Sequence, residues 1–103
     1  MTPEESRARL AELRVAIETL DADLVRLMLE RRGLVLEVGK RKAELGLPVM
    51  DPTREAAVVR RAAAIARDVG GDEEMVRDVL WRIIASARDQ QEGRSGWGGP
   101  PKP

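Results

Sequence analysis

The chain has 103 residues, of which 43% are hydrophobic and 35% are charged, and its acidic and basic side chains balance to a net charge of zero. This length supports one domain at most, and the charge balance lacks the net positive field of a nucleic-acid binder, so we expect no nucleic-acid partner. Cysteine and histidine are both absent, which excludes disulfides, thiolate nucleophiles, Ser-His-Asp triads and the common zinc sites.

Buried surface has to come from aliphatic side chains, because Phe and Tyr are absent and Trp occurs only at positions 81 and 97. Leu, Ala and Met suit helices better than sheets, which favour aromatic and β-branched residues. The N-terminus lacks the basic start and apolar run of a signal peptide, and no apolar stretch approaches the roughly 20 residues of a membrane span. We therefore expect no membrane association and a cytoplasmic location.

The first helix is predicted to begin at Thr2-Pro3-Glu4-Glu5, which supplies an N-cap residue, a proline at the first helical position and acids in the first turn. Gly46-Leu47-Pro48 predicts its end. Between these signals, apolar residues recur three and four positions apart, as expected for one helix face. They are Leu10, Leu13, Ile17, Leu20, Leu24, Leu27, Leu34, Val38 and Leu45.

Asp51-Pro52 repeats the cap-and-proline signal and predicts a second helix, which ends before Gly70-Gly71. Its apolar residues are Ala57, Val58, Ala62, Ile65 and Ala66. A third helix is predicted from Asp72 to about Gln91, with its apolar residues at Val76, Val79, Leu80, Ile83, Ile84 and Ala87. The domain is expected over residues 1–92, and the glycine- and proline-rich residues 93–103 are predicted to be a disordered tail.

The length of the first helix predicts the assembly. A helix over residues 4–45 is about 60 Å long, whereas a compact domain of this size has a radius of gyration of only about 13 Å. Two shorter helices cannot cover its apolar face. We therefore expect an all-α fold with three helices per chain, one of them very long, that pairs with a second copy into an intertwined homodimeric helical bundle.

Two cations, Arg31 and Lys42, stand where the apolar face of the first helix would have leucines. Either side chain alone could reach solvent from the edge of a helix. Both together, on one face and three turns apart, would be costly without a partner, so an anionic ligand between them is the economical explanation. Arg14 lies too far along the helix to reach Lys42 of its own chain, but it could complete the pocket of an antiparallel partner. Taken alone, Arg14 is more often a surface arginine.

Polar residues also cluster at the start of the second helix and at the end of the third. Asp51, Arg54 and Glu55 form the first group, in which Asp51 has an equally good structural reading as a helix cap. Gln91 closes the apolar face of the third helix, where a glutamine is ordinarily just a polar end. These residues name no reaction by themselves.

As a set, four short patterns resemble the all-helical chorismate mutase family. They are Leu13-Arg14-x-x-Ile17-x-x-Leu20-Asp21, Leu29-Glu30-Arg31-Arg32, Glu37-Val38-Gly39-Lys40-x-Lys42 and Pro48-Val49-x-Asp51-x-x-Arg54-Glu55. The resemblance covers residues 10–91 without a gap. It implies an intertwined dimer and an isomerase that converts chorismate to prephenate in aromatic amino acid biosynthesis. Because that rearrangement is intramolecular and pericyclic, it needs no nucleophile, no proton shuttle and no cofactor.

The resemblance also implies which residue makes each of the main contacts with the substrate. Arg14 from one subunit and Arg31 from the other would grip the two carboxylates of chorismate. Lys42 would bridge a carboxylate and the ether oxygen, and Gln91 would donate to the same ether oxygen. Lys42 and Gln91 are thus the expected catalytic donors, because the breaking C–O bond leaves that oxygen electron-rich.

The remaining implied residues surround the substrate. Asp51 and Glu55 would face the substrate hydroxyl, Lys42 or both. Arg54 would brace the pocket, and Val38 would line its apolar wall. No metal ligand set is expected.

The register of the third helix departs from the family pattern at one position. The family often has a serine four residues before the glutamine, and here that residue is alanine. A shift by one residue would pair Ser86 with Gln90, but it would push Asp78 and Arg82 into places that the core needs for apolar residues. We therefore favour Gln91 over Gln90.

Two other functions stay open. An isochorismate pyruvate lyase shares the fold and the basic pocket but resembles this chain less around Asp51, Arg54 and Glu55. A non-catalytic helical interaction module would leave Arg31 and Lys42 unexplained. The resemblance also leaves room for docking on another shikimate-pathway enzyme.

Overall fold

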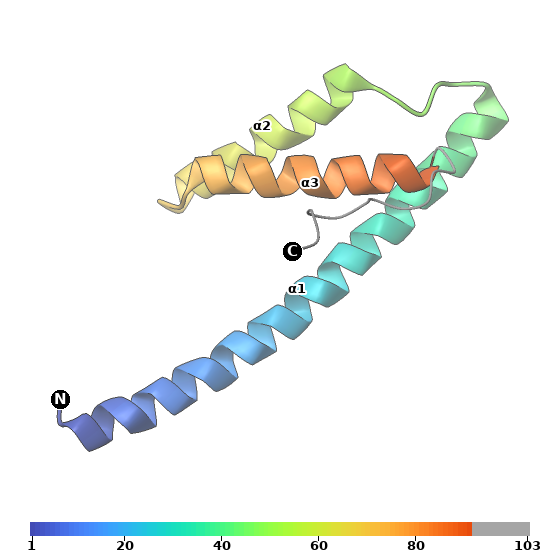
Figure 1. Ribbon diagram of the computed structural model, residues 1–103. Helices are drawn as coiled ribbons and strands as arrows, with labels where there is room; N and C mark the ends of the chain where they lie inside the picture. Colours follow the sequence, from blue (N-terminus) through green and yellow to red (C-terminus); the bar gives the residue numbers. More distant parts are fainter. Residues whose placement is uncertain (92–103) are drawn as a thin grey trace, which may run out of the picture. The chain divides into compact units, whose positions relative to one another are not determined.

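The structure, a computed structural model, describes residues 1–91, and all regular structure within this range is helical (Figure 1). The three helices are α1 (Pro3–Leu45), α2 (Pro52–Asp68) and α3 (Glu73–Gln91). The prediction of three helices with one very long member is confirmed. The expected disordered tail at 93–103 lies outside the described residues. None of the helices within 1–91 has the length and apolar character that crossing a membrane requires.

Paired hydrogen bonds define both ends of α1. The backbone N–H of Glu5 donates to Thr2 Oγ1 at 3.1 Å, and the backbone N–H of Thr2 donates to Glu5 Oε1 at 3.1 Å. This reciprocal pair is a capping box, and hydrogen bonding to the Thr2 side chain and backbone lowers the pKa of Glu5. At the other end Gly46 has a φ of 69° and Leu47 N–H donates to Lys42 O at 2.8 Å. Gly46 thus supplies the left-handed residue of a Schellman ending.

The chain divides into two compact units, Met1–Gly33 and Leu34–Pro103, with the boundary inside α1. The first unit is a single helical segment, and α1 as a whole buries none of its residues. The apolar side chains of the face predicted for residues 10–27 are between 42% and 61% exposed, and they are Leu10, Leu13, Ile17, Leu20, Leu24 and Leu27. A continuous apolar helix face of this kind has no core of its own within residues 1–33, and exposed apolar patches mark interaction surfaces.

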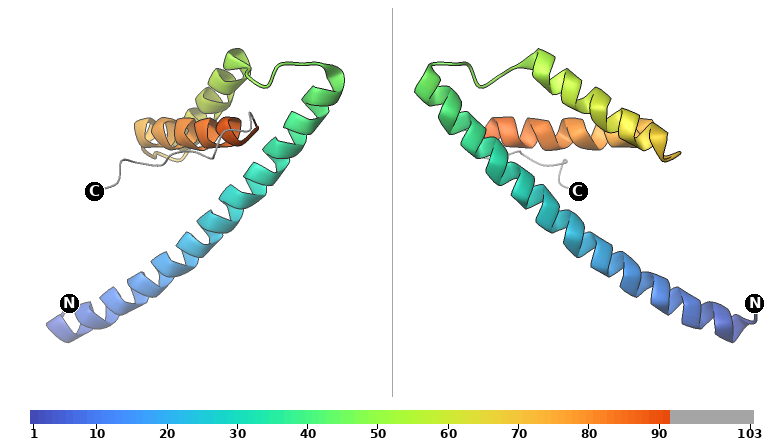
Figure 2. Two further views of the ribbon diagram at one scale, coloured as in Figure 1. Left: turned by 45° about the vertical axis from the view of Figure 1, so that its right-hand side comes forward. Right: turned by 180° about the vertical axis from the view of Figure 1, so that it is seen from behind.

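The core of the second unit lies between α2 and α3, which pack side by side as an antiparallel pair (Figure 2). The α2 side supplies Val59, Ala63 and Ala66, and the α3 side supplies Ile84, Ser86 and Ala87. Spacings of three and four residues place the α2 set on one helix face, and the spacing of three between Ile84 and Ala87 does the same on α3. Most of these residues are small, which lets the two helices approach closely.

This core corrects part of the sequence prediction. Ile65 was predicted on the apolar face of α2 but is 59% exposed, and Val79 of α3 is 44% exposed. Ile65 lies about 100° around the helix from Ala66, so a face centred on Ala66 and Ala63 turns it outward. Ile84 and Ala87 are buried as expected, whereas the burial of Ser86 was not foreseen.

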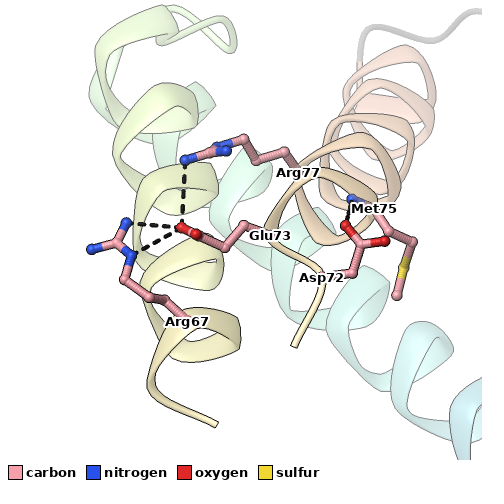
Figure 3. Close-up of polar contacts among 5 residues, drawn as sticks. All are labelled: Arg67, Asp72, Glu73, Met75 and Arg77. Atoms are coloured by element: carbon pink, nitrogen blue, oxygen red, sulfur yellow. Dashed lines mark hydrogen bonds and ion pairs between the residues drawn. The ribbon is translucent and has the colours of Figure 1, made fainter. Parts of the chain in front are cut away.

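The turn between α2 and α3 is held by both backbone and side chains. Gly70 has a φ of 71°, and Gly71 N–H donates to Ala66 O at 2.7 Å, a second Schellman ending. Asp72 then caps α3, because its Oδ1 accepts the Met75 backbone N–H at 2.9 Å (Figure 3). These contacts fix where α2 stops and α3 starts.

Glu73 links the two helices at the same turn (Figure 3). Its Oε1 lies 2.9 Å from Arg67 Nη2 and 3.8 Å from Arg77 Nη2. The hydrogen bond to Glu73, with its negative charge, raises the pKa of Arg67. Arg67 is 63% exposed, so solvent screens this pair and its contribution to stability is small.

Candidate active site

The predicted site residues fall on both units. Arg14 and Arg31 belong to the first, where Arg14 is exposed and Arg31 is half-buried. Both stand on α1, and at 1.5 Å of rise per residue they are about 25 Å apart along the helix axis. The two arginines of one chain are therefore too far apart to hold the same small molecule. The other predicted residues, which are Val38, Lys42, Asp51, Arg54, Glu55 and Gln91, belong to the second unit.

Gln91 turns its side chain toward the C-terminal part of α1. Its amide Nε2 donates a hydrogen bond to the backbone carbonyl of Val35. The side chain lies directly over Gly39, where an added Cβ would stand 3.0 Å from Nε2 and 3.2 Å from Cγ of Gln91. Gly39 therefore leaves the room that Gln91 fills. Gln91 is half-buried, whereas Gln90 is exposed.

Lys42 stands one turn further along the same face of α1, three residues after Gly39. It is half-buried, and its Nζ donates to the backbone carbonyl of Val49 at 3.1 Å. The contact ties α1 to the segment that leads into α2. Lys42 and Gln91 thus bring two N–H donors to one face of α1, and each of them donates to a main-chain carbonyl.

Asp51 is the N-cap of α2, as its structural reading predicted. Its Oδ1 accepts the backbone N–H of Arg54 at 3.0 Å, and Pro52 follows in the first turn. Both Asp51 and Arg54 are exposed, and Val38 is 49% exposed. The structure gives Asp51 a clear architectural role, and a further role in a site stays a prediction.

Glu55 is held by a residue that the sequence analysis did not select. Arg88 Nη1 lies 2.6 Å from Glu55 Oε1, and the two side chains are only 24% and 15% exposed. Arg88 Nε is buried and has no hydrogen-bond partner among residues 1–91. A signal for Arg88 was present in the sequence, since it precedes Gln91 by three residues and so shares its helix face.

These contacts are three separate ones within the second unit, and their residues are called the cluster below. Gln91 reaches Val35 and Gly39 on α1, Lys42 reaches the segment before α2, and Arg88 joins α3 back to Glu55 on α2. The cluster offers hydrogen-bond donors and positive charge. Within the described part of the chain no group of three or more His, Cys, Asp or Glu side chains could hold a metal ion.

Comparison with known proteins identifies the family. Residues 13–92 match the family described as chorismate mutase type II. The chain is 37% identical over 75 residues to a T-protein of Haemophilus influenzae, an alignment that covers 73% of this chain and 20% of the relative. The chain thus spans about a fifth of the length of the T-proteins that it matches.

Two relatives of similar size extend the comparison. A 4-amino-4-deoxychorismate mutase of Streptomyces venezuelae is 34% identical over 75 residues, which cover 73% of each chain. The solved structure of a chorismate mutase (form II) from Thermus thermophilus superposes with a TM-score of 0.76 at 31% identity, over 86% of this chain and 99% of that one. On the family match and the shared fold together, the chain belongs to the chorismate mutase type II family.

Proposed function

We propose that the chain is a chorismate mutase, an isomerase that rearranges chorismate to prephenate in aromatic amino acid biosynthesis. The observation that carries the proposal is the match of residues 13–92 to this family. The side-chain hydrogen-bond donors Lys42 and Gln91 of the second unit support it. An intramolecular rearrangement needs donors aimed at the oxygen that gains charge, and it needs no nucleophile or cofactor. A chain without His and Cys can supply such donors.

In this proposal Lys42 and Gln91 both donate to the ether oxygen of the substrate, and Lys42 also meets a carboxylate. Without substrate they donate to the carbonyl oxygens of Val49 and Val35. Substrate binding would exchange one acceptor for another, a small net change in hydrogen bonding. In this proposal the two side chains are ordered by these hydrogen bonds before the substrate arrives, and ordered donors favour efficient electrostatic stabilisation.

The carboxylates of the substrate require a second chain. Arg14 and Arg31 would each take one carboxylate through a two-pronged guanidinium contact. Because they are about 25 Å apart on one helix, Arg14 has to come from the partner. We therefore propose an intertwined homodimer with two shared sites, and the exposed apolar face of residues 10–27 supports this assembly.

The other residues are assigned by the same reasoning. Asp51 and Glu55 would face the hydroxyl of the substrate, Arg54 would brace the pocket, and Val38 would line its apolar wall. A cytoplasmic location and docking on another shikimate-pathway enzyme remain predictions.

A second candidate substrate is 4-amino-4-deoxychorismate, favoured by the Streptomyces venezuelae relative that matches this chain over 73% of both lengths. This molecule carries an amino group in place of the hydroxyl at one ring carbon. Aliphatic amines are positively charged at neutral pH. The two substrates therefore differ in charge at a single position.

Turnover of three candidate substrates tests the proposal. Purified protein is mixed in turn with chorismate, 4-amino-4-deoxychorismate and isochorismate, substrate loss is followed by absorbance, and products are identified by chromatography and mass spectrometry. We expect prephenate from chorismate at the highest kcat/KM. Pyruvate released from isochorismate as the main reaction, or no turnover of any of the three, would contradict it.

A further inference from the structure

The ion pair between Glu55 and Arg88 is more enclosed than the ion pair between Glu73 and Arg67 at the turn between α2 and α3. The two side chains are 15% and 24% exposed, whereas the partners of the pair between Glu73 and Arg67 are 32% and 63% exposed. Screening by water and salt is correspondingly weaker at Glu55 and Arg88. The charge of one partner therefore acts strongly on the other.

This pair is not arranged for the greatest stability. Arg88 Nε is buried without a hydrogen-bond partner among the described residues, and an unsatisfied buried donor costs free energy. Enclosed ion pairs are in any case often no more stabilising than apolar side chains of the same size. Because the unsatisfied Arg88 Nε costs free energy, we attribute the pair to a role in the adjoining site rather than to stabilisation of the fold.

The pair lies between the two ends of the site. Glu55 is one turn beyond Asp51 on α2, and Arg88 is one turn before Gln91 on α3. Under the proposed function, Glu55 faces the substrate hydroxyl. Arg88 is thus paired with the Glu55 carboxylate. In the proposed function this carboxylate faces the hydroxyl of chorismate, or the amino group that replaces it in 4-amino-4-deoxychorismate.

We propose that Arg88 is a positioning residue that determines specificity, because by compensating the charge of Glu55 it makes the site favour a hydroxyl over an ammonium group. The inference rests on the proposed function. An uncompensated Glu55 carboxylate would attract an ammonium group through a charge-assisted hydrogen bond. Arg88 cancels that attraction and repels a second cation. A hydroxyl carries no charge, and it can still donate to a carboxylate oxygen.

Two substitutions with opposite predicted effects test this inference. Arg88→Gln removes the compensating charge and leaves a hydrogen-bond donor for Glu55, so kcat/KM for 4-amino-4-deoxychorismate relative to chorismate should rise about tenfold. Glu55→Gln leaves Arg88 unopposed, so the same ratio should fall. Arg88→Lys retains the positive charge and should keep the wild-type ratio. All ratios are measured at neutral pH on the full chain.

Arg77→Gln serves as the matched control, because Arg77 is also an ion-paired arginine of α3 but pairs with Glu73 at the far turn. Its ratio and its activity should equal those of the wild type. A parallel loss of both activities in Arg88→Gln, with an unchanged ratio, would show that Arg88 only supports the fold. If circular dichroism shows that Arg88→Gln does not fold, Glu55→Gln decides the inference. A fall in its ratio supports the role of Arg88, and an unchanged or higher ratio contradicts it.

Calorimetric titration with the two ligands separates this inference from the proposed function. If the wild type binds both ligands but converts neither, the proposed function fails while the affinity ratios of Arg88→Gln and Glu55→Gln still test the role of Arg88. If the wild type binds neither ligand, both proposals are overturned.

Discussion

Gln91 is the residue at which the chemistry of the site is easiest to isolate. Its amide donates to the carbonyl of Val35, so a glutamate in its place would set a carboxylate against another acceptor. Two acceptors repel one another unless one of them takes a proton. The neighbouring carbonyl, an anionic substrate and partial burial all favour the protonated form and raise the pKa of the introduced carboxyl group, whereas Lys42 opposes this shift.

We expect Gln91→Glu to have low activity at neutral pH and to recover activity as the solution is acidified. The ionised carboxylate can only accept hydrogen bonds and would repel the charge that develops on the ether oxygen, whereas its protonated form can donate one. The measurement is kcat against pH for the variant and the wild type. The wild type should show no gain of activity as the solution is acidified.

Gln90→Glu is the matched control, because Gln90 is the exposed neighbour on the same helix. Its pH profile should match that of the wild type. If Gln90→Glu recovers activity in acid and Gln91→Glu does not, the functional register is the alternative one, which pairs Ser86 with Gln90.

Asp51 combines an observed cap with a predicted place in the site, and substitution separates the two. Asp51→Ala loses the hydrogen bond to Arg54 N–H and should cost about 1 kcal/mol of unfolding free energy. Asp51→Asn keeps a good capping side chain and should leave stability unchanged. If the carboxylate faces the substrate, Asp51→Asn still lowers kcat/KM.

Asp72→Ala provides the comparison, since Asp72 caps α3 with the same geometry away from the cluster. It should cost a similar free energy of unfolding without changing kcat/KM of the folded protein. Full activity in Asp51→Asn would restrict Asp51 to its capping role.

At the scale of the helices, the meeting of α1 and α3 depends on the absence of a side chain at Gly39. Alanine there would bring a Cβ to 3.0 Å from the Gln91 amide and displace it from the Val35 carbonyl. Gly39→Ala should therefore lower kcat several-fold. Its stability should change little, because the gain in helix propensity of about 1 kcal/mol is offset by the lost contact.

Gly33→Ala is the control for helix propensity, because an added Cβ at Gly33 meets nothing within 4 Å. It should stabilise the protein by about 1 kcal/mol and keep wild-type kcat. In a Gln91→Ala background, Gly39→Ala should have no further effect on kcat, since the side chain that it displaces is gone. An additive loss in the double variant would separate Gly39 from Gln91.

The helices themselves could be predicted closely from local chemistry. Thr2-Pro3, Asp51-Pro52, Gly46 and Gly70 act through their own backbone and nearest neighbours, so their signals are readable in one sequence. Contacts between helices were harder to predict. Ile65 was misjudged because α2 meets α3 through Val59, Ala63 and Ala66, and small alanines carry little weight in an apolar pattern.

The same distinction applies to the candidate site, where features of one helix could be predicted and contacts between helices could not. Lys42 was selected because it interrupts an apolar face, which a single helix reveals. Gln91 was selected because of the resemblance to the family. Arg88 was missed because its significance lies in Glu55, which is 33 residues away in sequence and on another helix. The need for glycine at position 39 likewise depends on Gln91 of α3, which is distant in sequence and lies against Gly39 only in the folded chain.

At the scale of the whole molecule, the exposed apolar face of residues 10–27 predicts a dimer whose stability depends on concentration. Pairing with a second chain favours the folded state by mass action, so the midpoint of thermal or urea unfolding should rise with protein concentration. Circular dichroism over a hundredfold concentration range, with light scattering for the mass, measures this. A stable monomer at micromolar concentration with a constant midpoint would exclude the assembly.

The shared site is the central claim, and mixing two inactive variants tests it most directly. Arg14→Ala and Arg31→Ala should each be nearly inactive, because each removes a carboxylate contact from both sites of its own dimer. Unfolded together and refolded, they should recover about a quarter of wild-type activity, since half of the dimers are mixed and each mixed dimer has one intact site. If mixed dimers are verified by mass spectrometry and chorismate turnover stays at the level of the single variants, Arg14 and Arg31 do not meet across the two chains and the account is wrong.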